Sequence, residues 1–193
     1  HPTWSLPIQE ALRARDIDLE LIDVAAYRWR ADEPPPHADR WINRVNSMPS
    51  GERSASVVAA TRQLLLWLDL HDQVVVNGAL PHAIGCSKAG QGALFARLGM
   101  HTPPSVAIRN PSDAQAAATA LGYPVLVKPN VGGSGVGIAR FDDIVEPRDI
   151  DLGMDGTGIV QRVIESVDGL VYRVEMLGTD VLYGTAQPLA TDG

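Results

Sequence analysis

The sequence predicts a small α/β unit followed by a region of helices and antiparallel strands. In the first half, an amphipathic helix over residues 54–70 leads into residues 73–77, a β-branched run apolar enough for a buried strand of a parallel sheet. In the second half, short stretches with alternating apolar and polar residues follow one another closely, which is typical of antiparallel strands. We therefore expect an α/β domain over residues 1–82 and an α+β domain over residues 83–193.

The first half contains helix and strand signals on both sides of a proline-rich loop. Ile8, Ala11 and Leu12 have helical spacing, whereas residues 34–36 are three prolines, which exclude both a helix and a central strand. The order of signals lacks the opening strand of an α/β unit, and we expect that strand before His1. The expected elements are helices over residues 7–15 and 54–70 and strands over residues 19–24, 41–45 and 73–77.

The second half has its own helix boundaries. Gly99 is expected to end a helix over residues 88–98, because two prolines soon follow it. Ser112 and Gln115 have the spacing of a capping box for an alanine-rich helix, and Gly122 is expected to end that helix. The expected strands cover residues 105–109, 124–128, 138–141, 159–164, 170–177 and 181–186, the third of them being the return strand of a hairpin.

The composition limits the classes of function. The formal net charge is −7, so the chain has no global basic field for nucleic acid, although a local phosphate pocket remains compatible with it. The chain has a single cysteine, Cys86, which excludes a disulfide framework and favours a reducing cytoplasm. We predict that Cys86 is a packing residue, because no histidine lies in a recognisable arrangement with it. No apolar run approaches the roughly 20 residues of a membrane helix. We expect a cytoplasmic protein without a membrane or nucleic-acid partner, and the scattered histidines predict no zinc site.

One segment carries the chemistry. Residues 124–127 form an apolar strand that delivers Lys128, and four glycines then fall within six residues, from Gly132 to Gly137. Glycine permits a positive φ and lets a ligand approach the backbone, and consecutive N–H groups in such a loop can surround an anion. With the positive charge of Lys128 beside it, this segment predicts a phosphate-binding loop.

This loop differs from the common phosphate loops. No Lys-Ser or Lys-Thr pair follows the glycines, as in a Walker A loop, and no helix pattern follows them, as in a dinucleotide fingerprint. The loop lies between two strands, so we expect it to cover the phosphates as a flap. The structural alternative is a hairpin turn beside an exposed lysine, but such a turn needs only one or two glycines, and additional ones cost backbone entropy.

The order of motifs resembles the ATP-grasp superfamily from about Val74 to the end of the chain. The matching segments cover residues 75–77, 87–91, 98–104 and 121–129. They are most similar to the carboxylate–amine ligases that add glutamate or related amino acids to a carboxylate, such as the ribosomal protein S6 modification enzyme. The resemblance implies a small Rossmann-like pre-ATP-grasp unit in the first domain and the first part of an ATP-grasp domain in the second.

The resemblance also assigns the nucleotide contacts. It implies that Lys88 and Lys128 contact the ATP phosphates and that Glu165 or Asp168 holds the ribose hydroxyls. The family more often has Glu at or beside the position of Gln161. The implied flap consists of Gly132, Gly133, Ser134, Gly135 and Gly137, and the implied hinge strand beside the adenine consists of Gln161, Arg162, Val163 and Ile164.

The implied reaction joins a carboxylate to an amine at the expense of ATP. The carboxylate of a small molecule or a peptide would become an acylphosphate, and the amine of an amino acid would attack it to form an amide. Family members bind Mg²⁺ through an Asp, a Glu and an Asn late in the chain, in a region expected after Gly193, so the catalytic and metal-binding residues stay unassigned here. The resemblance also allows a homo-oligomer.

Several alternatives stay open. A non-catalytic or degenerate ATP-binding module is the main rival, and a ligase that forms a thioester or acts on a purine precursor is a weaker one. Arg44 and the loop over residues 46–51 follow a short strand. Because ligands of α/β units bind beyond the carboxyl ends of strands, this loop is a candidate contact for the acceptor, and a plain surface loop is its alternative.

Overall fold

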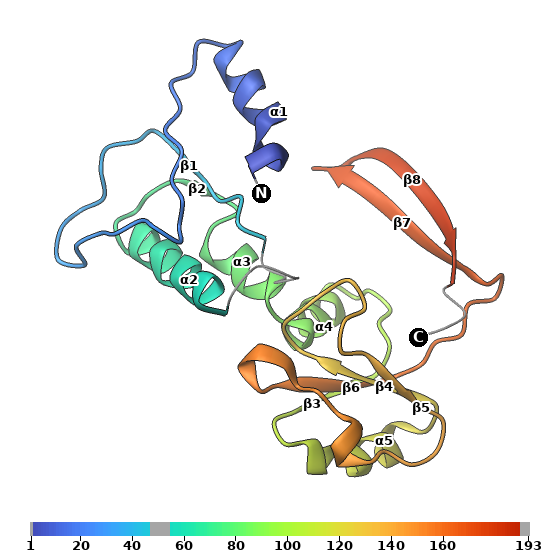
Figure 1. The fold of residues 1–193 in the computed structure, drawn as a ribbon. Helices are drawn as coiled ribbons and strands as arrows, with labels where there is room; N and C mark the ends of the chain where they lie inside the picture. The colour runs from blue at the N-terminus through green and yellow to red at the C-terminus, as the bar shows by residue number, and fades with distance from the viewer. Residues whose placement is uncertain (1, 47–54, 190–193) are drawn as a thin grey trace.

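The computed structural model describes residues 2–46 and 55–189, and the mixed order of helices and strands agrees with the predicted fold class (Figure 1). Two short strands pair in parallel in the N-terminal part, with Trp41 opposite Val75 and Ile42 opposite Val76. This part therefore has the predicted α/β character. Its elements are α1 (Pro2–Arg13), β1 (Trp41–Ile42), α2 (Ala55–Leu70), β2 (Val75–Val76) and α3 (Ala79–Gly85).

Aromatic packing on α2 forms the N-terminal core. Trp67 and Leu68 of α2 are buried, and Trp29 and Trp41 pack against them from the segment between α1 and α2. The ring of Trp67 lies 5.9 Å from that of Trp29, and its indole N–H donates to the carbonyl oxygen of Glu33 at 3.2 Å. These contacts hold a long irregular segment to α2.

The strand expected over residues 19–24 is wrong, because this segment forms no regular element. Leu19 and Leu21 are 37% and 62% exposed, so no sheet buries an apolar face there, and Val24 packs against the α2 cluster instead. The strand expected over residues 41–45 is shorter than predicted. It ends at Ile42 because the side chain of Asn43, rather than a strand ladder, accepts the N–H of Val45 at 2.9 Å.

Helix α3 was not expected. Its seven residues are too few to show a periodic pattern, and Pro81 argues against a helix except in a first turn, which is where it lies. The boundary expected between residues 82 and 83 falls inside α3. The start of α1 at Pro2 is likewise earlier than the expected start at residue 7.

The C-terminal part contains a four-stranded sheet in the order β3-β6-β4-β5, with all three pairings antiparallel. β4 and β5 form the predicted hairpin around the glycine-rich loop. The elements of this part are α4 (Lys88–Arg97), β3 (Ser105–Ile108), η1 (Pro111–Asp113), α5 (Ala114–Leu121), β4 (Val125–Pro129), β5 (Ala139–Phe141), η2 (Pro147–Asp149), η3 (Gly153–Asp155), β6 (Gly158–Arg162), β7 (Leu170–Leu177) and β8 (Asp180–Pro188).

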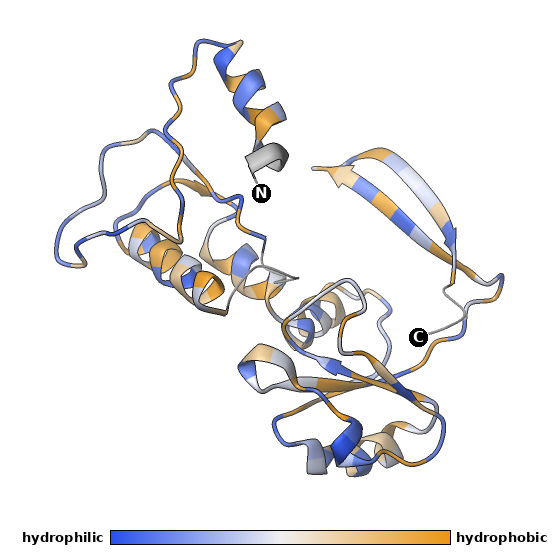
Figure 2. Ribbon diagram, viewed as in Figure 1, coloured by the Kyte–Doolittle hydropathy of each residue, from blue (hydrophilic) through white to orange (hydrophobic). Residues whose placement is uncertain are grey.

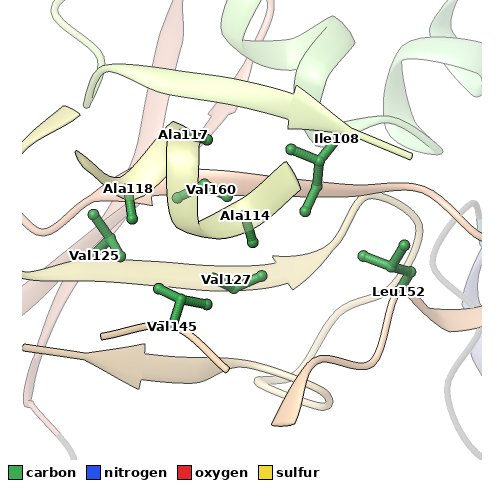
Figure 3. Close-up of a cluster of buried hydrophobic side chains, with 9 residues drawn as sticks. All are labelled: Ile108, Ala114, Ala117, Ala118, Val125, Val127, Val145, Leu152 and Val160. Carbon is green, nitrogen blue, oxygen red and sulfur yellow. The ribbon is translucent and has the colours of Figure 1, made fainter. Parts of the chain in front are cut away.

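One face of this sheet is covered by α5. Ala114 and Ala118 of α5 pack against Val125, Val127 and Val160 of the two central strands, and all five side chains are buried (Figure 3). Side chains alternate along a strand, so residues 126, 128 and 161 lie on the opposite face. The sheet therefore separates an apolar core from the face that carries the candidate site.

The start of α5 differs from the predicted capping box. Asp113 occupies the N-cap position, and its side chain makes no capping hydrogen bond. The Gln115 side chain instead accepts the Tyr123 hydroxyl proton at 3.1 Å and the Val145 N–H at 2.8 Å. Gln115 therefore bonds to residues distant in the sequence instead of capping its own helix. Gly122 follows the helix with φ 78°, as predicted.

Strands β7 and β8 form a long antiparallel ribbon that stands apart from the four-stranded sheet (Figure 1). Apolar and polar residues alternate along it (Figure 2), and large side chains such as Val174 and Tyr183 are more than half exposed. Across residues 2–46 and 55–189, no helix has the length and apolar character needed to cross a membrane.

Candidate functional site

The sequence contains two lysines, Lys88 and Lys128, and the structure brings both to the glycine-rich loop. Lys88 opens α4, and Lys128 lies on β4, on the sheet face opposite α5. Burial lowers the pKa of Lys128, and the charge of Lys88 lowers it further. Burial also lowers the pKa of Lys88, whereas the carboxylate of Asp155 opposes that change. Two partly buried cations therefore lie close enough to repel each other.

The hydrogen-bond partners of both lysines are neutral. Lys88 Nζ donates to the carbonyl oxygens of Pro129 at 2.7 Å, Gly132 at 2.9 Å and Asn130 at 3.4 Å. Lys128 Nζ donates to the side-chain oxygen of Gln161 at 2.7 Å. Neither lysine forms an ion pair within the described ranges. Because an unpaired charge is costly to desolvate, this pair of cations favours a bound anion.

The glycine-rich loop has the backbone freedom that the sequence predicts. Gly132, Gly135 and Gly137 have φ values of 145°, 78° and 72°, and Ser134 also adopts a positive φ of 57°. A Cβ on Gly137 would lie 2.8 Å from the Pro129 ring, so this position excludes a side chain on steric grounds as well. A cavity of about 140 Å³ lies between the loop and residues 151–154. Neither lysine is among the described residues that line this cavity, but Lys88 donates to the carbonyl oxygens of Pro129 and Gly132 in its wall.

Asn130 fastens this loop to the start of α4. Its side-chain oxygen accepts the Ser87 hydroxyl proton at 3.2 Å and the Ala89 N–H at 3.0 Å. Its backbone oxygen accepts the Lys88 N–H at 3.1 Å, and its own N–H donates to the Thr157 carbonyl oxygen at 2.9 Å. The base of the loop and the helix that carries Lys88 thus form one hydrogen-bonded unit. Sequence reasoning missed Asn130, because its partners at residues 87–89 are distant in the chain.

We expect Asn130→Leu to weaken ATP binding by roughly tenfold to thirtyfold, because it removes two hydrogen bonds of about 1 kcal/mol each that position α4 and the loop. Asn130→Asp keeps an acceptor for the Ser87 and Ala89 protons and should retain most of the affinity. Calorimetric titration of both variants measures the difference, and Asn110→Leu on the exposed η1 turn is a matched control. Equal affinities for the leucine and aspartate variants would contradict this positioning role.

The predicted adenine hinge, residues 161–164, spans the end of β6. The N–H of Arg162 donates to the Pro104 carbonyl oxygen at 3.0 Å, and that of Val163 donates to the Pro124 carbonyl oxygen at 2.9 Å. Both N–H groups are therefore already hydrogen-bonded within the protein. Gln161 contributes its side chain to Lys128, and Ile164 is 65% exposed beyond the strand. A base bound here would therefore meet the backbone at and after Ile164 rather than the N–H groups of the strand.

The two acidic residues proposed for the ribose have different surroundings. Glu165 forms an exposed ion pair with Arg140 of β5 at 3.2 Å. The carboxylate of Asp168 accepts hydrogen bonds from the Tyr172 and Ser166 hydroxyls and from the Leu170 N–H, and its pKa is lowered, mainly by the Tyr172 bond. Asp168 thus orders the turn before β7, and Glu165 lies nearer in sequence to the hinge.

The expectation that Cys86 has no histidine partner is wrong. His82 lies one helical turn earlier in α3, and its Nε2 is 3.6 Å from the Cys86 sulfur. Burial raises the pKa of the Cys86 thiol and lowers the pKa of His82. Both shifts favour the neutral pair over a thiolate and an imidazolium. The contact therefore supports the packing role that the sequence predicts for Cys86.

Metal ligands do not gather in the part of the chain that the structure describes: residues 2–46 and 55–189 contain no group of three or more His, Cys, Asp or Glu side chains suited to a metal ion. The residues present therefore fit the phosphates of a nucleotide better than they fit Mg²⁺.

Comparison with known families matches the segment that carries the two lysines. The family model described as the ATP-binding domain of the carbamoyl-phosphate synthase L chain matches residues 88–148, a segment that begins at Lys88 and includes Lys128 and the glycine-rich loop. The crystal structure of a RimK domain ATP-grasp protein from Sphaerobacter thermophilus superimposes with a TM-score of 0.67 at 20% identity, over 95% of this chain and 70% of that chain. The chain thus has the fold of an ATP-grasp protein.

Curated relatives point toward ligases. A D-alanine–D-alanine ligase from Methylococcus capsulatus is 28% identical over 170 residues, which is 88% of this chain and 52% of that enzyme. A second, from Chromohalobacter salexigens, is 34% identical over 113 residues, covering 55% of this chain and 34% of that enzyme. The chain therefore spans about half the length of the first relative and about a third of the second.

Proposed function

We propose that this chain is the nucleotide-binding part of an ATP-dependent carboxylate–amine ligase. The observation that carries the proposal is the pair of partly buried lysines at the glycine-rich loop, whose hydrogen-bond partners within the described part of the chain are neutral. Polyphosphate would supply negative charge to both lysines, of which Lys88 already feels the carboxylate of Asp155. The match of residues 88–148 to an ATP-binding domain supports nucleotide binding, and the 28% identity to a D-alanine–D-alanine ligase over 170 residues supports the reaction class.

The chain's own residues would bind and shield the nucleotide. Lys128 has one neutral partner, so the remaining protons of its ammonium group can reach a phosphate without disrupting the loop. Lys88 donates to three loop carbonyls and would have to exchange at least one of them for a phosphate oxygen. The glycines at residues 132–137 would close over the phosphates and keep water from an activated carboxylate.

Bound ATP supplies a phosphoryl group that activates a carboxylate for attack by an amine. The proposed substrates are the carboxylate of a small molecule or peptide and the amine of an amino acid. Charge compensation at Lys88 and Lys128 stabilises the transferred phosphoryl group electrostatically, which is the main contribution that proteins make to phosphoryl transfer.

Calorimetric titration with ATP, ADP and GTP tests the proposal. We expect ATP and ADP to bind with similar affinity and GTP to bind more weakly. A panel of carboxylates and amino acids, assayed for phosphate release on the full-length protein, then tests ligation. Adenine nucleotide binding without release of phosphate for any pair would support the rival, a non-catalytic ATP-binding module. No nucleotide binding by either the chain or the full-length protein would refute both.

A further inference from the structure

A second cavity lies at the carboxyl ends of β1 and β2, away from the glycine-rich loop. It has a volume of about 360 Å³, which falls within the usual range for small-molecule sites. The polar residues among its described lining are Asn43, Arg44, Asn46, Asn77 and His82. Nothing described so far for the nucleotide uses these residues.

The floor of this cavity is a rigid hydrogen-bonded frame. Asn43 and Asn77 each directly follow one of the two parallel strands, so both side chains lie at the same edge. Asn43 Nδ2 donates to the Asn77 carbonyl oxygen at 2.9 Å, and Asn77 Nδ2 donates to the Asn43 carbonyl oxygen at 3.4 Å. Asn77 also has a φ of 55°, and residues held in this left-handed region concentrate at ligand sites.

The described part of the lining carries a positive charge. Arg44 is the one ionised side chain among the described residues that line the cavity, in a chain whose net charge is −7. His82 is 4% exposed and reaches the same cavity from α3, and burial lowers its pKa, so its imidazole is neutral at pH 7. A guanidinium can hold a carboxylate through two parallel hydrogen bonds, and amide and imidazole groups beside it can contact the other polar atoms of the same molecule.

The cavity is linked to the nucleotide site through α3. His82 contacts Cys86, and Ser87 and Lys88 follow directly at the start of α4. On the other side of Cys86, the charge of Asp155 in η3 acts on its thiol, although burial and Arg62 act more strongly. The neighbouring η3 residues Gly153 and Met154 bound the cavity under the glycine-rich loop. One short helix therefore connects the two cavities.

We propose that the cavity at the ends of β1 and β2 binds the carboxylate group of a small amino-acid-like molecule, with Arg44 pairing with the carboxylate and Asn77 and His82 contacting its polar atoms. The further statement that this molecule is a ligase substrate rests on the proposed function. Binding itself does not, because it uses none of the residues assigned to the nucleotide.

Nuclear magnetic resonance of the histidine imidazoles tests the binding. The His82 signal is assigned by its loss in His82→Gln. The protein is then titrated with L-alanine and D-alanine, and with L-alaninamide and D-alaninamide, in which the carboxylate is replaced by an amide. We expect at least one of the two acids to shift the His82 signal and its amide counterpart to do so at least tenfold more weakly. Arg44→Gln should weaken the response to that acid roughly tenfold or more, whereas Arg40→Gln, an exposed change just before β1, should leave it unchanged.

Two results would overturn this inference: no acid shifts the His82 signal, or the response is the same for acid and amide or for wild type and Arg44→Gln. ATP is titrated calorimetrically into the same samples. Intact ATP binding with no response at His82 rejects the carboxylate site alone. A response at His82 without ATP binding rejects the proposed function and leaves the carboxylate site standing.

Discussion

Replacement of Lys128 by alanine should weaken ATP binding by roughly tenfold to a hundredfold, because a hydrogen bond to a charged group contributes about 1.5–3 kcal/mol. The same change should not lower thermal stability. Lys128 is desolvated beside Lys88, and both effects lower its pKa, so its positive charge is unfavourable in the free protein. A loss of affinity without a loss of stability is expected of a residue that serves a ligand. Calorimetry and thermal unfolding of the same samples measure the two quantities.

Arg97→Ala is the matched control for Lys128, because it removes a positive charge from the exposed end of α4. Its ATP affinity should remain within about twofold of wild type, since exposed charges act weakly across screened solvent. Unchanged ATP affinity in Lys128→Ala, or an equal loss in both variants, would refute the phosphate role of Lys128. Because the pKa of Lys128 is lowered, its charge in the free protein is lost at a lower pH than that of an ordinary lysine. ATP affinity should therefore begin to fall earlier as the pH rises.

Leu68→Ala should lower the free energy of unfolding by about 2–5 kcal/mol, the usual cost of truncating a buried leucine. Leu68 is 1% exposed and lies in the cluster where Trp29 and Trp41 pack on α2. Leu66, on the same helix, is 46% exposed, and Leu66→Ala should cost less than about 1 kcal/mol. Urea unfolding of both variants measures the difference. A loss below about 1 kcal/mol for Leu68→Ala would show that the cluster around it contributes little to the stability of the N-terminal part.

Local sequence signals predicted the elements around the glycine-rich loop well. The strand that delivers Lys128, the return strand, the helix from Lys88 and the stop at Gly122 all depend on neighbours within a few residues, and they are confirmed. The strand predicted over residues 19–24 is wrong, because Val24 packs on the distant helix α2 and the segment does not pair as a strand. The predicted capping role of Gln115 is also wrong for a tertiary reason, because its side chain accepts hydrogen bonds from residues 123 and 145.

Only part of the candidate site could be predicted from the sequence. Glycine spacing identified the loop, and the resemblance assigned Lys88 and Lys128, because these features follow one another along the chain. The role of Asn130 depends on residues 87–89 returning beside it, and the contact of His82 with Cys86 depends on α3, which has no periodic pattern. Contacts made by folding across distant segments leave no local signature.

The hydrogen bonds of Asn130 determine which segments can be exchanged between related proteins. In the sequence the glycine-rich loop looks like a segment that could be exchanged by itself. In the structure, hydrogen bonds connect its first residues to the start of α4: the Asn130 side chain binds Ser87 and Ala89, the Lys88 side chain binds the Gly132 carbonyl oxygen, and the Lys88 N–H binds the Asn130 carbonyl oxygen. A loop transplanted from a relative would therefore need residues 87–89 from the same donor. Chimeras that exchange both segments together should keep nucleotide affinity, and those that exchange the loop alone should behave like Asn130→Leu.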